Sequence, residues 1–220
     1  MTCVIIIQNF CKCLTALVFY LSYRVEYIGR HNIPKKEKSV IAANHSSYLD
    51  TVLITDKLFG RIFWGMAKNT LFKSPIIGLF LRFVGAFPVN RDSMEKKSLK
   101  TFLQLMAKNQ CVVIFPEGTR TQTGELQPGK IGTGMIIHKA KTKVVPVYVH
   151  GTFTAWPKGQ KFPKLRKRII ITFGEEIDFT KYFTAKGDKE IYQQITDVIM
   201  ESIKTLKESV LAKLEMEKNN

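Results

Sequence analysis

A histidine and an aspartate stand five positions apart in the segment NHSSYLD, residues 44–50. An imidazole nitrogen that donates a hydrogen bond to a carboxylate is fixed in one tautomer, which leaves the other nitrogen to act as a base near neutral pH. Serine proteases use the same histidine–aspartate logic with their own serine as nucleophile, whereas here the nucleophile could be a substrate hydroxyl. The pair His45 and Asp50 therefore predicts general-base chemistry. A surface histidine beside an aspartate that starts a helix is the alternative.

A second polar segment, FPEGTR at residues 115–120, follows an apolar run that is typical of a buried strand. Ligands bind at strand ends in open α/β sheets. Gly118 permits close approach of the backbone or a positive φ, Thr119 offers a hydroxyl, and Arg120 offers a two-pronged fork for a phosphate. The segment predicts an anion site, with an ordinary polar turn as the alternative.

Two more cations follow apolar segments in the same way. Lys68 comes just after a strand expected over residues 61–66, and Arg91 comes just after a strand expected over residues 85–89. Singly, each is typical of a solvated surface charge. Together with Arg120 they form a set of three cations after three expected strands, and such a set could converge on one anionic group.

The elements that must position these residues alternate between strands and helices. We expect strands over residues 39–43, 61–66, 85–89, 112–115, 144–149 and 168–173. We expect helices that begin near residue 48 and over residues 71–84, 93–108, 132–140 and 191–214, the last with apolar residues at helical spacing. This order predicts an α/β fold, a single domain with a mixed central β-sheet flanked by helices.

The N-terminal segment is mostly apolar from residue 4 to residue 23, but Gln8 and Lys12 interrupt it. A lysine in the middle of a membrane span costs about 2.5–3.5 kcal/mol, whereas a helix in the interface keeps its polar stripe in water. We therefore expect a membrane-associated helix over residues 1–23 that lies in the interface, followed by one domain over residues 24–220. A spanning helix and a helix packed on the domain are the alternatives.

The charge of the chain favours anionic partners. Lysine and arginine number 34 against 18 aspartate and glutamate residues, a formal net charge of +16. Six of these cations fall within residues 158–168, next to Trp156 and Phe162, a combination that suits an anionic membrane surface. A solvated basic loop is the alternative. No nucleic-acid-binding motif is present, so we expect no nucleic-acid partner.

The four cysteines do not have the spacing of a metal site. Cys11 and Cys13 are two residues apart, but no second pair or nearby histidine completes a zinc set. We expect no bound metal, and reduced thiols in a protein that faces the cytoplasm.

Four blocks of this sequence, in order, resemble the glycerolipid acyltransferases, in the branch that acylates 1-acylglycerol 3-phosphate. The resemblance covers about residues 24 to 175. FPEGTR in place of a Glu-Gly-Gly-Arg form is similar to enzymes whose acceptor already carries one acyl chain. Family members commonly have Lys-x-Glu-Leu where this chain has residues 68–71, KNTL, and Thr121 replaces a frequent serine. The four blocks are NHSSYLD at 44–50, GAFPVNR at 85–91, FPEGTR at 115–120 and VVPVYV at 144–149.

The resemblance implies a reaction and roles for these residues. His45, oriented by Asp50, would deprotonate the sn-2 hydroxyl of lysophosphatidic acid, and that oxygen would attack the thioester of acyl-CoA or of an acyl carrier protein. No acyl-enzyme, metal or other cofactor is implied. Lys68 could stabilise the oxyanion of the thioester instead of binding the phosphate. The residues expected to bind the acceptor are Lys68, Arg91, Glu117, Gly118, Thr119 and Arg120.

The resemblance also implies association with the cytoplasmic face of the inner membrane. Two alternatives share the same sequence blocks. One is an acyltransferase of this family that acts on another lysolipid. The other is a non-catalytic membrane lipid-binding module, which would need neither His45 nor Asp50.

Overall fold

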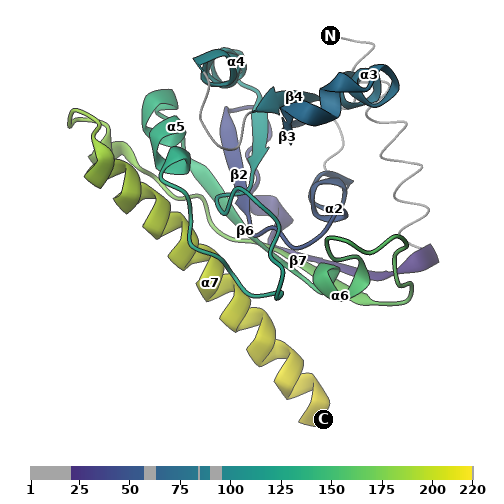
Figure 1. The fold of residues 1–220 in the computed structure, drawn as a ribbon. Helices are drawn as coiled ribbons and strands as arrows, with labels where there is room; N and C mark the ends of the chain where they lie inside the picture. Colours follow the sequence, from purple (N-terminus) through teal and green to yellow (C-terminus); the bar gives the residue numbers. More distant parts are fainter. Residues whose placement is uncertain (1–20, 57–62, 84, 90–95, 220) are drawn as a thin grey trace.

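The structure of the chain is a computed structural model that describes residues 21–56, 63–83, 85–89 and 96–219. Within these residues, one sheet of seven strands has the order β1-β7-β6-β2-β5-β3-β4 (Figure 1). Only the β6–β7 pair is antiparallel, so the sheet is mixed, as the sequence predicts. The strands are β1 (Arg24–Ile28), β2 (Ser39–Ala43), β3 (Phe63–Lys68), β4 (Ala86–Val89), β5 (Cys111–Ile114), β6 (Val144–His150) and β7 (Arg168–Phe173).

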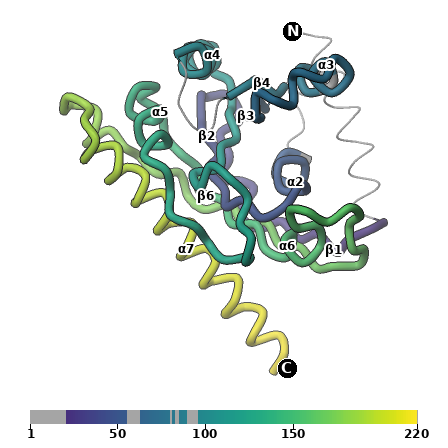
Figure 2. The backbone as a smooth tube through the Cα atoms, viewed as in Figure 1, coloured from purple at the N-terminus to yellow at the C-terminus, as the bar shows by residue number. Residues whose placement is uncertain are grey.

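Helices cover both faces of this sheet. The helices are α2 (Asp50–Asp56), α3 (Pro75–Phe83), α4 (Lys96–Ala107), α5 (Gly132–Ala140), α6 (Thr152–Ala155) and α7 (Lys189–Asn219). The described residues also form three short 3₁₀ turns: η1 (Arg30–Asn32), η2 (Asn69–Lys73) and η3 (Thr180–Tyr182). Apolar residues of α4, α5 and α7 pack in one core cluster, and those of α2 and α6 pack in another. In Figure 2, α2 and α7 accordingly lie on opposite sides of the sheet.

Strand β2 shows why the sequences of the central strands are almost continuously apolar. Val40 and Ala42 belong to the core cluster under α4, α5 and α7, while Ile41 and Ala43 belong to the cluster under α2. All four side chains are fully buried. A parallel strand that is covered on both faces has no polar side to alternate with. The apolar run of β2 therefore ends at the carboxyl end of the strand, where polar residues begin.

Helix α7 is the longest helix of the described residues and closes the first face. Ile195, Ile199 and Ile203 recur every four residues and are fully buried, and Val210 continues the stripe. A stripe at this spacing places one face of the helix on the core and leaves the other in water. In Figure 1, α7 runs along the sheet beside α5, with the C-terminus at its far end.

Several sequence-based boundaries need correction. The helix expected near residue 48 begins at Asp50, and the strand expected over 61–66 runs from Phe63 to Lys68. The helix expected over 71–84 is a 3₁₀ turn followed by α3, which begins at Pro75 because proline suits the first helical position. Strand β1 was not predicted, since its charged, half-exposed sequence lacks a buried run.

The expected N-terminal membrane-associated helix falls almost wholly on residues 1–20, which lie outside the described residues, and so does Arg91. Within the described part of the chain, no helix has the length and apolar character needed to cross a membrane.

Candidate active site

The polar residues singled out in the sequence gather at one edge of the sheet. Strands β2, β5, β3 and β4 are consecutive neighbours and all parallel, so their carboxyl ends meet at the same edge. His45 follows β2, Glu117 and Arg120 follow β5, and Lys68 is the exposed last residue of β3. Ligands in open α/β sheets bind at this edge.

His45 and Asp50 form a buried pair. His45 Nδ1 lies 2.9 Å from Asp50 Oδ2, and the two residues are 8% and 0% exposed. The main-chain N–H groups of Ser46 and Ser47 donate to the same oxygen, at 2.7 and 2.8 Å. Because a carboxylate accepts hydrogen bonds, we assign the Nδ1 proton to His45, and this tautomer leaves Nε2 as the basic nitrogen.

The turn between the two residues explains their spacing. Ser47 Oγ accepts a hydrogen bond from the main-chain N–H of Leu49, at 3.1 Å, and donates one to the carbonyl of Trp156, at 2.6 Å. These bonds delay the start of α2 to Asp50. The aspartate side chain, on the first helical turn, can then reach back over the turn to the imidazole. The start of this helix, expected near residue 48, therefore lies two residues later.

Asn44 fastens the start of this turn to the neighbouring strand. Its side-chain amide donates to the carbonyl of Val149, at 3.1 Å, and its side-chain oxygen accepts from the N–H of Val149, at 2.7 Å. The amide thus continues the β2–β6 pairing by one position after the strand has ended. This fixes the point from which the His45 side chain projects.

The segment after β5 contacts both the main chain and the imidazole ring of His45. The main-chain N–H of His45 donates to Glu117 Oε1, at 3.1 Å, and its carbonyl accepts from the N–H of Thr121, at 2.8 Å. The imidazole stacks on the ring of Phe115, with centroids 3.8 Å apart and planes at 12°. The backbone and the ring plane of His45 are therefore fixed before any substrate arrives.

Glu117 is a buried carboxyl, 2% exposed. Burial raises its pKa to about 7, and the negative charge of Asp50 adds to that rise, while hydrogen bonds from the His45 N–H and from Gln127 oppose it. Gln127 Nε2 donates to Glu117 Oε2 at 2.9 Å. Glu117 thus shapes the site by bracing the main chain of His45.

Gly118 makes the turn after β5 possible. It adopts a φ of +71°, and its N–H donates to the carbonyl of Phe115 at 2.9 Å. A Cβ at this position would lie 2.8 Å from Cδ of Lys130, so a side chain would meet both strain and a neighbour. The carbonyl of Thr119 accepts from Gln127 Nε2 at 3.2 Å, which ties the turn to the loop that follows.

Arg120 lies against an aromatic side chain. Its Cζ is 3.6 Å from the centroid of the Tyr48 ring, and Tyr48 lies 5.3 Å from Trp156 between ring centroids. Arg120 Nη1 is buried and has no hydrogen-bond partner among the described residues. A buried N–H of a guanidinium needs an acceptor, and a bound anion would supply one.

Sequence reasoning assigned no role to four residues that shape the site. Phe115, Tyr48 and Asn44 fall inside the recognised blocks, so their positions were marked although their contacts were not. Gln127 falls outside every block, and no sequence signal separates it from a solvated loop residue.

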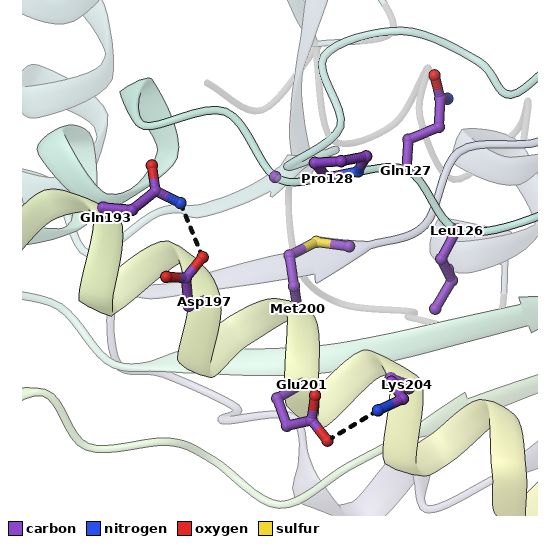
Figure 3. A pocket seen from close by; sticks show the side chains of 9 residues that line it. Leu126, Gln127, Pro128, Gln193, Asp197, Met200, Glu201 and Lys204 are labelled. Atoms are coloured by element: carbon purple, nitrogen blue, oxygen red, sulfur yellow. Dashed lines mark hydrogen bonds and ion pairs between the residues drawn. The ribbon is translucent and has the colours of Figure 1, made fainter.

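A hollow of about 360 Å³ lies between the 126–129 segment and α7 (Figure 3); Gln127 lines it, but the other site residues described above do not. Its polar side chains on α7 bond one another: Gln193 donates to Asp197 at 2.7 Å, and Lys204 pairs with Glu201 at 3.4 Å. We assign it no part in the reaction. Among the described residues, no group of three His, Cys, Asp or Glu side chains could hold a metal ion.

Comparison with known proteins places the chain in a family. Residues 24–150, more than half of the chain, match the model of the Acyltransferase family. The chain belongs to this family. The acyltransferase is 32% identical to the 1-acyl-sn-glycerol-3-phosphate acyltransferase of Bacillus subtilis over 196 residues, which is 88% of this chain and 94% of that protein. The resemblance inferred from the four sequence blocks is confirmed.

More distant relatives carry the same name. A chloroplastic 1-acyl-sn-glycerol-3-phosphate acyltransferase of Brassica napus is 31% identical to this acyltransferase over 155 residues, 68% of this chain and 44% of that longer protein. The crystal structure of the 1-acyl-sn-glycerophosphate (LPA) acyltransferase from Thermotoga maritima matches with a TM-score of 0.69 and 26% identity, covering 91% of this chain and 78% of that one. The α/β fold predicted from the sequence is therefore the fold of a solved relative.

Proposed function

We propose that this acyltransferase moves a fatty acyl group from an acyl thioester to the sn-2 hydroxyl of lysophosphatidic acid and so forms phosphatidic acid. The observation that carries the proposal is the buried pair of His45 and Asp50 at the carboxyl edge of the sheet. The names of the Bacillus subtilis and Brassica napus relatives support the same acceptor.

His45 acts as the general base. Its Nε2 takes the proton of the acceptor hydroxyl as that oxygen attacks the thioester carbonyl, and the C–S bond then breaks to release a thiol. Asp50 orients the imidazole and stabilises the imidazolium that forms, because its charge lies 2.9 Å from Nδ1. The imidazolium returns the proton to the leaving sulfur. The substrate supplies the nucleophile, so no acyl-enzyme forms.

The phosphate of the acceptor binds beside Arg120. The buried Nη1 that has no partner among the described residues gives this arginine a donor for a phosphate oxygen. Lys68 stands exposed at the same edge of the sheet. Arg91, which lies outside the described residues, is proposed as a further cation for the phosphate. Glu117, Gly118 and Thr119 form the turn from which Arg120 projects.

The acyl donor is a thioester of coenzyme A or of acyl carrier protein, and no other cofactor takes part. A thiol is a good leaving group, and a fixed base with positioned donors can transfer an acyl group from it without a metal. Both donors are acidic molecules, and the chain carries a net charge of +16, so the charge suits either of them.

An anionic membrane surface is the proposed place of reaction, on its cytoplasmic face. In the segment 158–168, Phe162 and Leu165 are 72% and 57% exposed among six cations. The segment is held in place by its main chain: the N–H of Lys164 donates to Ala155, and the N–H of Arg166 donates to Ser22. Exposed apolar side chains ringed by cations suit an anionic bilayer surface. The interfacial helix proposed for residues 1–23 includes Ser22 and would add to this attachment.

An acyl-transfer assay on the purified chain in detergent micelles tests the function. Lysophosphatidic acid is supplied with acyl-CoA in one arm and acyl carrier protein thioester in another, and thiol release and phosphatidic acid are both measured. Formation of phosphatidic acid with equal thiol supports the proposal. Thiol release without that product points to another lysolipid acceptor, and the absence of both from folded protein would contradict an enzymatic role.

A further inference from the structure

The guanidinium of Arg120 is held through its face. Its Cζ lies 3.6 Å from the centroid of Tyr48, which is closer than the other arginine–ring contacts of the described residues, at 5.8 Å for Arg30 over Tyr27 and 5.5 Å for Arg82 over Phe72. A cation over an aromatic face is attracted by the negative charge of the ring centre. The contact is therefore close enough to hold the guanidinium against the ring.

Stacking leaves the donors of an arginine available. All five N–H groups of a guanidinium point outward in its plane, so a ring against the face competes with none of them. Nη1 is buried and has no hydrogen-bond partner among the described residues. An arginine that is fixed by its face and still has an unused donor in its plane is prepared to bind an anion.

Tyr48 is itself supported from its surroundings. It lies between His45 and Asp50 in sequence, so its position is set by the same turn that carries the base. Trp156 lies 5.3 Å from it between ring centroids at 48°, and the carbonyl of Trp156 accepts the hydroxyl of Ser47. Tyr48 is nevertheless 49% exposed, so the ring adds little to the core. An exposed aromatic residue held in this way has a use outside packing.

We propose that Tyr48 is a positioning residue that holds Arg120 for the phosphate of the acceptor and thereby links the turn of the base to the anion site. The inference rests on the proposed function of the site and adds a residue that selects acidic acceptors. Tyr48 acts through Arg120, so its removal weakens acceptor binding and leaves the chemical step to His45.

Two substitutions in the full chain separate the ring from its hydroxyl. Tyr48→Leu removes the aromatic face, and we expect the KM for lysophosphatidic acid to rise about three- to tenfold while kcat changes little. Tyr48→Phe keeps the face and should retain the wild-type KM. A Tyr48→Leu variant with an unchanged KM would overturn the proposal, as would a Tyr48→Phe variant with the same defect as Tyr48→Leu.

A double-mutant cycle tests whether Tyr48 acts through Arg120. In an Arg120→Ala background, Tyr48→Leu should raise the KM no further, because the group it positions is gone. Equal effects in both backgrounds would show an independent role. Tyr182→Leu is a matched control, since Lys181 lies 5.0 Å from that ring and no site residue takes part. It should leave the KM unchanged.

A binding measurement separates this inference from the proposed reaction. The dissociation constant of a short-chain lysophosphatidic acid is measured by calorimetry on the same variants, and Tyr48→Leu should raise it by the same factor as the KM. Wild type that binds this lipid but forms no phosphatidic acid would contradict the proposed reaction and leave the role of Tyr48 standing. Equal affinity of wild type and Tyr48→Leu would overturn the role of Tyr48.

Discussion

The two halves of the site are built in different ways. The base half, around His45, Asp50 and Glu117, is buried and fixed by main-chain hydrogen bonds from two strand ends. The anion half, around Arg120 and Tyr48, is partly exposed and is held by a ring contact, with a buried donor that no described residue satisfies. Asp50 Oδ1 is also buried without a partner among the described residues, so the two halves differ in exposure and in how their side chains are held.

This difference separates chemistry from recognition. A base must be preorganised, because any reorganisation during the reaction adds to the barrier. In the proposed function, Arg120 instead binds a lipid that enters from outside, and its side chain is only partly buried. Changes in the base half should therefore lower kcat, and changes in the anion half should raise KM.

The largest effect in this comparison is expected from Asp50→Asn. An asparagine oxygen in the place of Asp50 Oδ2 can still accept from Ser46, Ser47 and His45 Nδ1, but asparagine carries no charge to stabilise the imidazolium that forms. We expect kcat to fall about a thousandfold with KM nearly unchanged. Steady-state kinetics measures both values, and a circular dichroism spectrum like that of wild type excludes loss of fold. A kcat within tenfold of wild type would remove Asp50 from its role.

Glu117 makes the base half sensitive to pH. Its pKa is raised from 4.5 to about 7 in the folded chain, so between these pH values folded Glu117 keeps its proton while unfolded Glu117 loses it. The free energy of unfolding should therefore fall as pH rises through this window, by about 3 kcal/mol for this group. Glu117→Gln mimics the protonated form and should lose that dependence.

Urea unfolding of wild type and Glu117→Gln at pH 5 and pH 8 measures this difference. The free energy of unfolding of Glu117→Gln, relative to that of wild type, should be higher at pH 8 than at pH 5. The same pH dependence in both proteins would show that Glu117 is not the group that titrates.

Arg120→Ala tests the anion half. A hydrogen bond to a charged group contributes about 1.5–3 kcal/mol, so the KM for lysophosphatidic acid should rise about tenfold or more. Arg120→Lys keeps the charge without the planar fork, so its KM for lysophosphatidic acid should lie between those of wild type and Arg120→Ala. A fall in kcat with no change in KM would place Arg120 in the chemical step and contradict the distinction between a base half and an anion half.

The smallest effect concerns the membrane segment next to the anion half. Replacing both Phe162 and Leu165 with serine removes exposed apolar surface and should weaken binding to vesicles of anionic lipid about tenfold. Activity on lipid dispersed in detergent should stay near that of wild type. Sedimentation with vesicles measures the first quantity. Unchanged binding by the double variant would assign attachment to another part of the chain.

Much of the fold could be predicted because the central strands are buried on both faces. The runs 39–43, 144–149 and 168–173 are mostly apolar, and each forms a strand within one residue of the expected bounds. Strand β1 (Arg24–Ile28) is an edge strand with a charged, half-exposed sequence, and only its parallel pairing with β7 defines it. Such pairing depends on residues far along the chain.

The site divides in the same way. The contact between His45 and Asp50 follows from local spacing, so the sequence predicts it. The contacts of His45 with Glu117 and Phe115 span about 70 residues and arise because β2 and β5 are neighbours in the sheet. The donor from Gln127 has no sequence signal, because it depends on where the loop after the 115–120 turn comes to rest.

The central claim is that His45 is the base of an acyl transfer to lysophosphatidic acid. The most direct test compares purified wild type with His45→Ala in the same micelles, measuring phosphatidic acid and free thiol from one reaction. Wild type should form both in equal amounts, and His45→Ala should lose both by about a thousandfold while still sedimenting with anionic vesicles. Phosphatidic acid formation by His45→Ala within tenfold of the wild-type rate would contradict the account.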